Sequence, residues 1–320
     1  AHIADAQITN AKIATGEITG NRLVDNTITA TQINANAVTA SELADNAVDT
    51  AAIADNAVTT AKIASGSKLV TTDAQANTVV GTNAGDSFTG TDAISNTLIG
   101  YDAGTAITSG DENTAVGRDA FKANTEGLRN TAVGSYALDA NTTANDNTAV
   151  GRSALGANTT GASNIAVGSY ALDTNTTGHY NTALGQGSLY FNDADGNTSV
   201  GYESMNANTT GSSNVAVGMY ALDANTTGGN NTAIGYEALT ANTTANNNTS
   251  VGRLSLTTNT TGTGNTAVGV NTLRLNTTGE SNVAFGTFAL DKNTTASNNS
   301  AFGYEALGAN TTGTKNTALG

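Results

Sequence analysis

A closing glycine recurs through most of this chain and sets a period of 17 residues. The stretch 130–134 reads Asn-Thr-Ala-Val-Gly, and close copies of it end at 14 glycines from Gly100 to Gly320. A single 16-residue step, from Gly185 to Gly201, interrupts the spacing. A period of this length is typical of a solenoid, whose units are too small to fold alone and are stabilised by their neighbours. We therefore expect a surface repeated many times instead of one cleft.

Positions within a unit are numbered from its closing glycine, so that Ser135 is position 1 and Gly151 is position 17. Position 4 carries large apolar residues, position 16 carries Val, Leu, Ile or Phe, and positions 7 and 13 carry asparagine. The sequence predicts two short strands per unit, joined by a bend at the glycine. Stacked asparagines can hydrogen-bond along the axis. The predicted structural ladders include Leu138, Leu155, Leu172, Leu222, Leu239, Asn130, Asn147, Asn164, Gly134 and Gly151.

Residues 1–66 form a different repeat, ten residues long, in which a branched aliphatic residue falls every five positions. The two series begin at Ile3 and Ile8. Neither the helical nor the strand period fits five, which favours short strands separated by tight turns. A single chain would bury little in such a repeat, so we expect an intertwined β-stalk of several chains. A one-chain pentapeptide-repeat helix is the alternative. Residues 67–100 are transitional degenerate repeats, and residues 101–320 form the 17-residue array.

Composition excludes several classes of function. The chain has 26 Asp and Glu against 12 Lys and Arg, a net charge of −14, which disfavours nucleic acid and anionic membranes as partners. It has no cysteine, so disulfides and thiolate zinc sites are excluded. The only histidines, His2 and His179, are far apart. We expect no enzyme activity, no cofactor and no membrane insertion in this span, which contains no apolar run of about 20 residues. Because it begins at Ala1 without an initiator methionine and stops on a closing glycine without a polar cap, we also expect it to be part of a longer protein or a segment whose ends are protected by other material.

Two groups of side chains are candidate binding residues. Asp193 and Asp195 lie where the period slips to 16, and their oxygens are of the kind that calcium prefers, although a plain Asp-Gly turn explains them as well. Tyrosines cluster just after the closing glycine, where they would either stack on sugars or pack between chains. These are Tyr136, Tyr170, Tyr202, Tyr220, Tyr236 and Tyr304. The recurrent Asn-Thr-Thr matches the N-glycosylation pattern, but it follows the repeat and is better explained as a turn.

The units resemble the YadA-like head repeats of trimeric autotransporter adhesins, as in Asn164-Ile165-Ala166-Val167-Gly168. The resemblance covers roughly residues 77–320 and implies a left-handed parallel β-roll that assembles as a homotrimer. Those heads typically use 14 residues per unit, so three extra residues are expected in the Asn-Thr-Thr loop. The ten-residue repeats resemble stalk repeats of bacteriophage tail fibres.

Together these features predict an all-β, parallel β-solenoid fibre, a homotrimer with an N-terminal β-stalk. The expected function is the structural shaft of a phage tail fibre that presents a receptor-binding tip, located in the virion. Expected partners are two further copies of the chain, other fibre or tail proteins at its ends, and host surface glycans. One alternative is a trimeric adhesin on a bacterial cell surface whose repeats bind glycan or matrix. The other is a monomeric solenoid filament or ice-binding protein.

Overall fold

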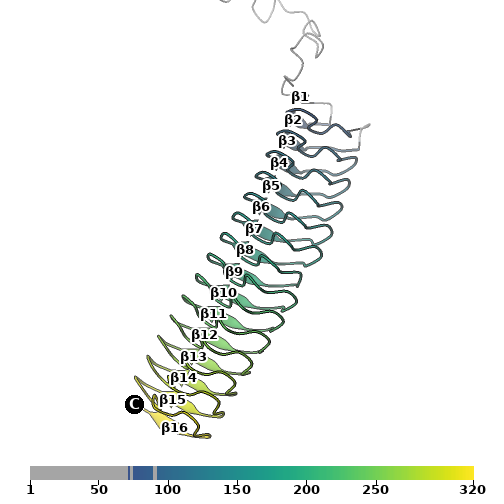
Figure 1. The fold of residues 1–320 in the computed structure, drawn as a ribbon. Coiled ribbons are helices and arrows are strands. Elements are labelled where there is room, and N and C mark those ends of the chain that lie inside the picture. The colour runs from purple at the N-terminus through teal and green to yellow at the C-terminus, as the bar shows by residue number, and fades with distance from the viewer. Residues whose placement is uncertain (1–70, 73–74, 89–91) are drawn as a thin grey trace, which may run out of the picture. The chain divides into compact units, whose positions relative to one another are not determined.

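The computed structural model describes residues 71–72, 75–88 and 92–320 of the chain. Contacts divide the chain into two units, Ala1–Lys62 and Ile63–Gly320, and all described residues belong to the second. The predicted β-stalk of residues 1–66 lies outside the described residues. The described part is a stack of turns that contributes one strand per turn to a single sheet, as Figure 1 shows.

The sheet contains 16 strands in chain order. Strand β1 pairs antiparallel with β2, and all later neighbours pair parallel. No helix occurs among the described residues. The strands are β1 (Thr71–Thr72), β2 (Thr78–Val80), β3 (Thr97–Ile99), β4 (Thr114–Val116), β5 (Thr131–Val133), β6 (Thr148–Val150), β7 (Ile165–Val167), β8 (Thr182–Leu184), β9 (Thr198–Val200), β10 (Val215–Val217), β11 (Thr232–Ile234), β12 (Thr249–Val251), β13 (Thr266–Val268), β14 (Val283–Phe285), β15 (Ser300–Phe302) and β16 (Thr317–Leu319).

The register explains the period, because equivalent residues of successive units are paired. Thr131 pairs with Thr148 and Val133 with Val150, a separation of one 17-residue turn. The 19-residue unit between Thr78 and Thr97 keeps this register, as does the 16-residue unit that ends in β9. Differences in unit length are therefore absorbed outside the strands. The predicted all-β parallel solenoid is confirmed.

Each strand from β2 to β15 turns only its middle residue inward. In β5 the side chain of Ala132 is fully buried, while Thr131 and Val133 on either side are partly exposed. A small residue at this point leaves room for Ala137 and Leu138, both fully buried, to fill the interior of the turn. The interior is therefore narrow and built from alternating small and large side chains, and it forms one hydrophobic cluster along the stack.

The second predicted strand of each unit is absent. Residues 135–140 form turns in which Tyr136 has a φ of 62° and Leu138 a φ of 50°, values that a β-strand does not adopt. The segment is nevertheless bonded to both neighbouring turns. The N–H of Tyr136 donates to the carbonyl of Arg118 at 3.0 Å, and that of Leu138 donates to the carbonyl of Ala154 at 3.0 Å. The prediction of two strands per unit was wrong because hydrogen bonding between turns does not require extended backbone.

The closing glycines stack directly on one another. Gly134 has a φ of +138°, and a Cβ atom added to it would lie 2.6 Å from the carbonyl carbon of Gly151. Both the backbone conformation and the close approach of the next turn therefore require glycine at this corner. The glycine column is the bend at which the strand ends and the turn segment begins.

Two columns of asparagine are buried inside the stack. The Oδ1 atom of Asn130 accepts the backbone N–H of Asn147 at 3.0 Å, and its Nδ2 atom donates to the carbonyl of Ala144 at 2.9 Å. In the second column, Nδ2 of Asn158 donates to Oδ1 of Asn141 at 3.1 Å. These bonds repeat along the axis and satisfy polar groups that would otherwise be costly to bury. Asn147 and Asn164, which the sequence predicts as ladder residues, lie in the same column as Asn130.

Candidate functional sites on the solenoid surface

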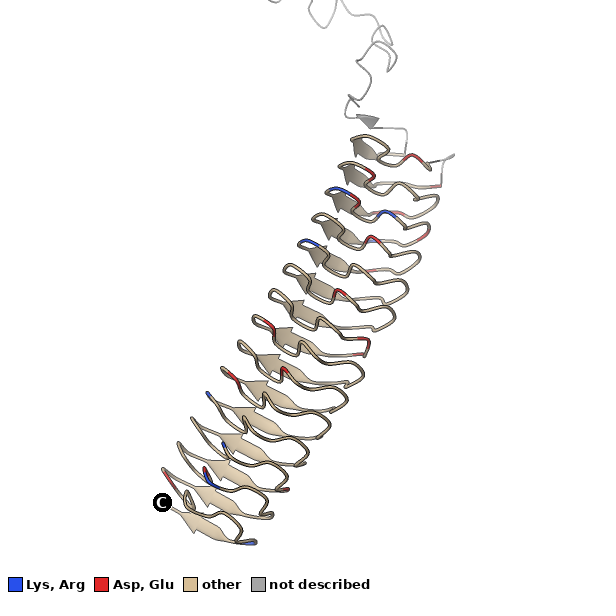
Figure 2. Ribbon diagram, in the orientation of Figure 1, with Lys and Arg blue, Asp and Glu red and all other residues tan. Residues whose placement is uncertain are grey.

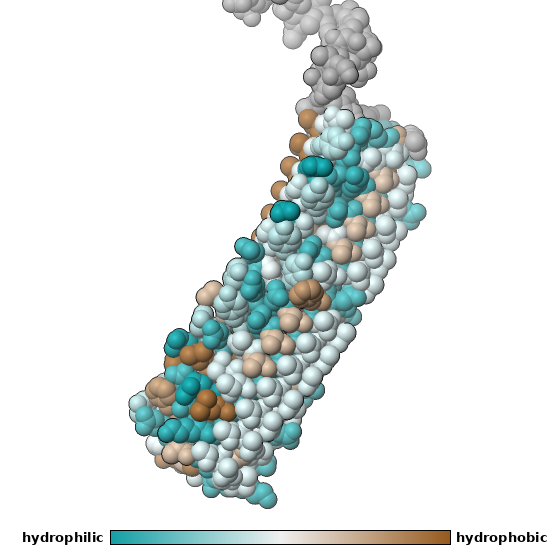
Figure 3. Space-filling model, viewed as in Figure 1, coloured by the Kyte–Doolittle hydropathy of each residue, from teal (hydrophilic) through white to brown (hydrophobic). Residues whose placement is uncertain are grey.

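The outer face of the sheet carries a continuous column of apolar side chains, which we call the apolar stripe. It consists of position 16 of every strand from β2 to β16, where the residues are Val, Ile, Leu or Phe. Leu184 is 47% exposed and Ile234 is 39% exposed, and the rings of Phe285 and Phe302 stack at 5.5 Å. Figure 3 shows hydrophobic side chains in a row at the upper left margin of the rod, beside the first strands. Threonines occupy most of the neighbouring column, position 14.

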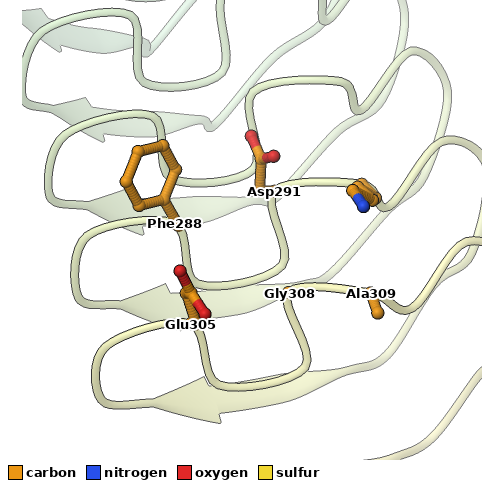
Figure 4. Close-up of a pocket in the computed structure, with 6 residues that line it drawn as sticks. Phe288, Asp291, Glu305, Gly308 and Ala309 are labelled. Carbon is orange, nitrogen blue, oxygen red and sulfur yellow. The ribbon is translucent and has the colours of Figure 1, made fainter.

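Separate hollows lie between positions 2 and 5 of several turns, beyond the glycine corner, and we call the surface that carries them the axial groove. Three of these hollows are formed by residues of neighbouring turns. They include Asp119 with Asp139, Tyr170 with Tyr190, and Phe288 with Asp291. Figure 4 shows the third, where Phe288 and Glu305 come from one column and Asp291 and Gly308 from the other. The groove therefore offers aromatic rings and carboxylates side by side.

Charged side chains are sparse and lie mainly in the turns and loops, as Figure 2 shows. Three carboxylates at position 5 of the axial groove are about half buried: Asp139, Asp173 and Asp223. Burial raises the pKa of each above its ordinary value. For Asp173, a hydrogen bond from Tyr190 and the positive charge of Arg152 favour the ionised carboxylate. Burial outweighs both, so the pKa of Asp173 stays above its ordinary value. These carboxylates are hydrogen-bond acceptors held in a partly desolvated surface.

The six candidate tyrosines occupy two adjacent positions and are all at least partly exposed. Tyr202, Tyr236 and Tyr304 lie at position 1, and Tyr136, Tyr170 and Tyr220 lie at position 2. Tyr202, Tyr220 and Tyr236 lie in three consecutive turns, whereas the turns on either side of Tyr136 and of Tyr170 have no aromatic residue at these positions. Arg118 covers the ring of Tyr136 at 5.7 Å, Arg152 covers Tyr170 at 5.2 Å, and Arg253 covers Tyr236 at 5.9 Å. Tyr202 and Tyr220 meet edge to face at 5.6 Å, and Tyr304 meets Phe288 in the same way at 6.2 Å.

Asp193 has a structural explanation. Its Oδ1 atom accepts the backbone N–H groups of Thr176 at 2.9 Å and Thr177 at 2.7 Å. In a regular turn a backbone carbonyl accepts the two equivalent N–H groups, as the carbonyl of Thr142 accepts those of Thr125 and Glu126. The unit that ends at Gly201 lacks position 9, and the carboxylate takes over the role of the carbonyl there. Burial raises the pKa of Asp193, but the hydrogen bonds from Thr177, Thr176 and Gly178 outweigh it and leave the pKa below its ordinary value.

Asp195 is also engaged within the fold. Its Oδ1 atom accepts the backbone N–H of His179 at 2.7 Å. Within the described ranges, no three His, Cys, Asp or Glu side chains are grouped so that they could hold a metal ion. The described residues likewise contain no helix long and apolar enough to cross a membrane. The two aspartates thus accept backbone hydrogen bonds at the shortened turn.

Comparison with known proteins found no matching family model, no matching curated protein and no matching solved structure. Arguments about function therefore rest on the chain's own surfaces. The axial groove was not predicted from the sequence. Its signal is visible in retrospect, because position 5 carries Asp139, Asp173, Asp223 and Asp291 while position 2 carries several aromatic residues.

Proposed function

We propose that this chain is the structural shaft of a homotrimeric fibre, of the kind that phages use as tail fibres, which spaces and presents a host-receptor-binding tip. The observation that carries the proposal is the apolar stripe. Soluble monomers rarely expose a long contiguous apolar surface, and a stripe that follows the whole rod favours partners of equal length and period. A second copy of the same chain meets this condition, because its stripe has the same spacing between turns.

Three copies are favoured over two by the resemblance to trimeric adhesin heads. Around a threefold axis each chain would turn its sheet inward, so that stripe residues such as Val217 and Ile234 meet their equivalents. Burial of such side chains contributes roughly 1.5 to 3 kcal/mol each when it is complete. Repeated over the strands from β2 to β16, even partial burial gives a large interface. The same contact would stiffen the shaft.

The construction of the interior supports a role as a spacer. Each turn adds about 4.8 Å of length, so the stack from β2 to β16 measures roughly 65 to 70 Å. The glycine and asparagine columns bond every turn to the next, which suits a rod that must hold its tip at a fixed distance. Partners at the two ends would be other fibre or tail proteins, and the fibre would lie in the virion.

Two alternatives each have one observation in their favour. The aromatic and acidic axial groove favours a trimeric adhesin of the bacterial cell surface whose repeats bind glycan or matrix. The threonine column beside the apolar stripe favours a monomeric filament or ice-binding protein, because flat threonine-rich sheets suit that function. Thermal hysteresis in a solution of monomers would support the ice-binding alternative.

Electron microscopy with a labelled antibody against residues 101–320 tests the proposed function. We expect the label along fibres attached to virions, at a constant distance from the tail. Label spread over the surface of bacterial cells would overturn the tail-fibre assignment and favour the adhesin. An antibody against an unrelated virion protein serves as the control for labelling efficiency.

A further inference from the structure

One turn of the array lacks a side chain in the middle of the axial groove. Position 2 is Gly187 in the unit that ends at Gly201, whereas neighbouring units carry Tyr170 and Glu203 there. Its φ of 65° is close to the 60° of Tyr170, so the backbone follows the regular path and only the side chain is missing. Gly187 lines a hollow of about 350 Å³, near the lower limit of ordinary ligand pockets.

Aromatic rings form one wall of this hollow. Tyr190 lies 6.4 Å from Tyr170 and 4.6 Å from Phe191, between ring centroids. Phe191 is 51% exposed although its ring contacts Tyr190, so much of its apolar surface faces solvent. Arg152 covers Tyr170 at 5.2 Å. Such a wall presents apolar ring surface at the edge of solvent.

Polar groups complete the lining of the hollow. Gln186, Glu203 and Asn206 line the hollow together with the backbone of Gly187. Nδ2 of Asn206 donates to the carbonyl of Gly187 at 3.0 Å, which places the amide at the rim of the hollow. A carboxylate and two amides supply both donors and acceptors, the groups needed for a ligand with several hydroxyls.

We propose that this hollow binds one pyranose ring of a neutral sugar chain. The aliphatic C–H face of the sugar would lie against Tyr190 and Phe191, while its hydroxyls would bond to Glu203, Gln186 and Asn206. The carboxylates of Glu203 and Asp173, and the net charge of −14, disfavour sugars that carry a carboxylate or sulfate. The ligand class is therefore a neutral or N-acetylated hexopyranose.

The other two hollows of the axial groove lack this combination. In the first, Lys122 bonds to Asp119 at 2.7 Å and to Asp102 at 3.2 Å, so ion pairs already occupy its polar groups. In the third, Phe288 is the only aromatic residue of the lining. Two rings, Tyr101 and Tyr136, also line the first hollow, whereas the Gly187 hollow has three rings and a carboxylate, Glu203, that forms no ion pair among the described residues. It lies beyond the glycine corner, outside the apolar stripe, so the inference does not depend on the proposed trimer.

Saturation-transfer NMR on the full chain tests the proposal. The probes are the methyl glycosides of glucose, galactose, mannose and N-acetylglucosamine, with methyl glucuronide as the anionic comparison. We expect transfer to at least one neutral glycoside, with a dissociation constant on the order of 1 mM, and weaker transfer to the glucuronide. Absence of transfer to every neutral glycoside, or stronger transfer to the glucuronide, would overturn the proposal.

Gly187→Tyr supplies the decisive variant, since it refills the hollow with a residue type that position 2 already accepts. A Cβ atom at Gly187 meets only the side-chain atoms Cγ of Glu203 at 3.3 Å and Nδ2 of Asn206 at 3.4 Å, both of which can move. We expect affinity to fall at least about tenfold. The matched control is Leu254→Tyr, at position 2 of a distant unit, which should bind like the unaltered chain.

Phe191→Ala is an independent second variant, because a half-exposed ring can be truncated without unfolding the turn. We expect it to weaken transfer as well. Binding unaffected by both Gly187→Tyr and Phe191→Ala would place the sugar elsewhere and refute the site. The solution mass of each protein is recorded alongside, so that failure of the trimer and failure of the sugar site are distinguished.

Discussion

Leu138 adopts a left-handed backbone conformation in the middle of the buried interior, and so does every residue of its column. The φ angles at position 4 lie between 48° and 55°, from Phe121 to Leu307. Large residues rarely adopt this conformation, and β-branched residues do so at particular cost. Position 4 is accordingly always Leu, Met or Phe in these units, whereas the strand position 16 is rich in Val and Ile. The two apolar columns therefore differ in residue type because they differ in backbone conformation.

This difference leads to a prediction at Leu222, whose φ is 54°. Replacement by isoleucine keeps the volume of the side chain but places a β-branched residue in the left-handed region. We expect Leu222→Ile to lower the free energy of unfolding by about 2 to 3 kcal/mol, more than the usual cost of such a swap. Leu222→Met is the control and should cost less than about 1.5 kcal/mol, because Met205 occupies the same position at 52°. Urea unfolding followed by circular dichroism measures both, and equal effects would contradict the account.

The period, the stacking register and the parallel sheet could be predicted from the sequence, because equivalent residues such as Val133 and Val150 recur at one spacing. The backbone conformation between the strands could not be predicted. A repeat period indicates which residues stack on one another, but it does not indicate which path the chain follows between them. The apolar pair Ala137 and Leu138 predicts a second strand, whereas the left-handed backbone at Leu138 forms a turn. The axial groove was missed for a related reason: positions 2 and 5 meet only when the left-handed residues bend the turn.

At the scale of one turn, the 16-residue unit shows how the solenoid tolerates a deletion. Loss of position 9 leaves N–H groups of the preceding turn without their usual carbonyl, and the carboxylate of Asp193 accepts them instead. Oδ1 also accepts the N–H of Gly178 at 3.2 Å, and Oδ2 accepts the hydroxyl of Thr176 at 2.8 Å. Strands β8 and β9 consequently keep the common register. The repair is local and leaves the interior unchanged.

Asp193→Ala is expected to destabilise the chain by about 1 to 2 kcal/mol at pH 7, because several N–H groups lose a charged acceptor. The folded protein lowers the pKa of Asp193, so its contribution to stability is present above the unfolded pKa of about 3.9 and is lost as the pH falls through the folded value. The difference from the unaltered chain should therefore shrink on acidification. Thr209→Ala, at position 8 of the next unit, keeps its backbone carbonyl and should show a small effect at every pH.

Asp223 is expected to behave in the opposite way. Burial, with a smaller effect from the charge of Glu203, raises its pKa, so the folded protein holds the proton more tightly than the unfolded chain. Its contribution to stability is complete below the unfolded pKa of about 3.9 and is lost as the pH rises through the folded value. Asp223→Asn should thus melt at a higher temperature than the unaltered chain at pH 7, and at the same temperature near pH 3. Asn206 already occupies position 5 in another unit, so the replacement fits. A lower melting temperature at pH 7 would argue against a costly buried charge.

At the scale of the whole molecule, the apolar stripe and the axial groove lie on different surfaces of the same turns. The stripe is uniform along the stack, as an interface between identical chains requires. The groove changes from turn to turn, as expected of a surface that is free to vary or to bind a ligand at one place. In the proposed fibre, this division would let one repeat serve both as a shaft and as the support for a local site.

Charge introduced into the stripe should separate the chains without unfolding them. Ile234→Lys and Phe285→Lys each place a lysine on a side chain that is about 40% exposed within the single chain, so the fold of the turn should persist. Across the proposed interface, each variant would bring like charges of three copies together near the axis. We expect a lower proportion of trimer at micromolar concentration. Tyr304→Lys, outside the stripe, is the control and should assemble normally.

Sedimentation equilibrium of the unaltered chain at micromolar concentration tests the central claim most directly. A homotrimer of the 31.8 kDa chain has a mass of about 95 kDa, three times that of one copy, and the proposed shaft predicts this value over a wide concentration range. A single species of 31.8 kDa would show that the stripe does not join copies of this chain, and it would contradict the trimeric shaft.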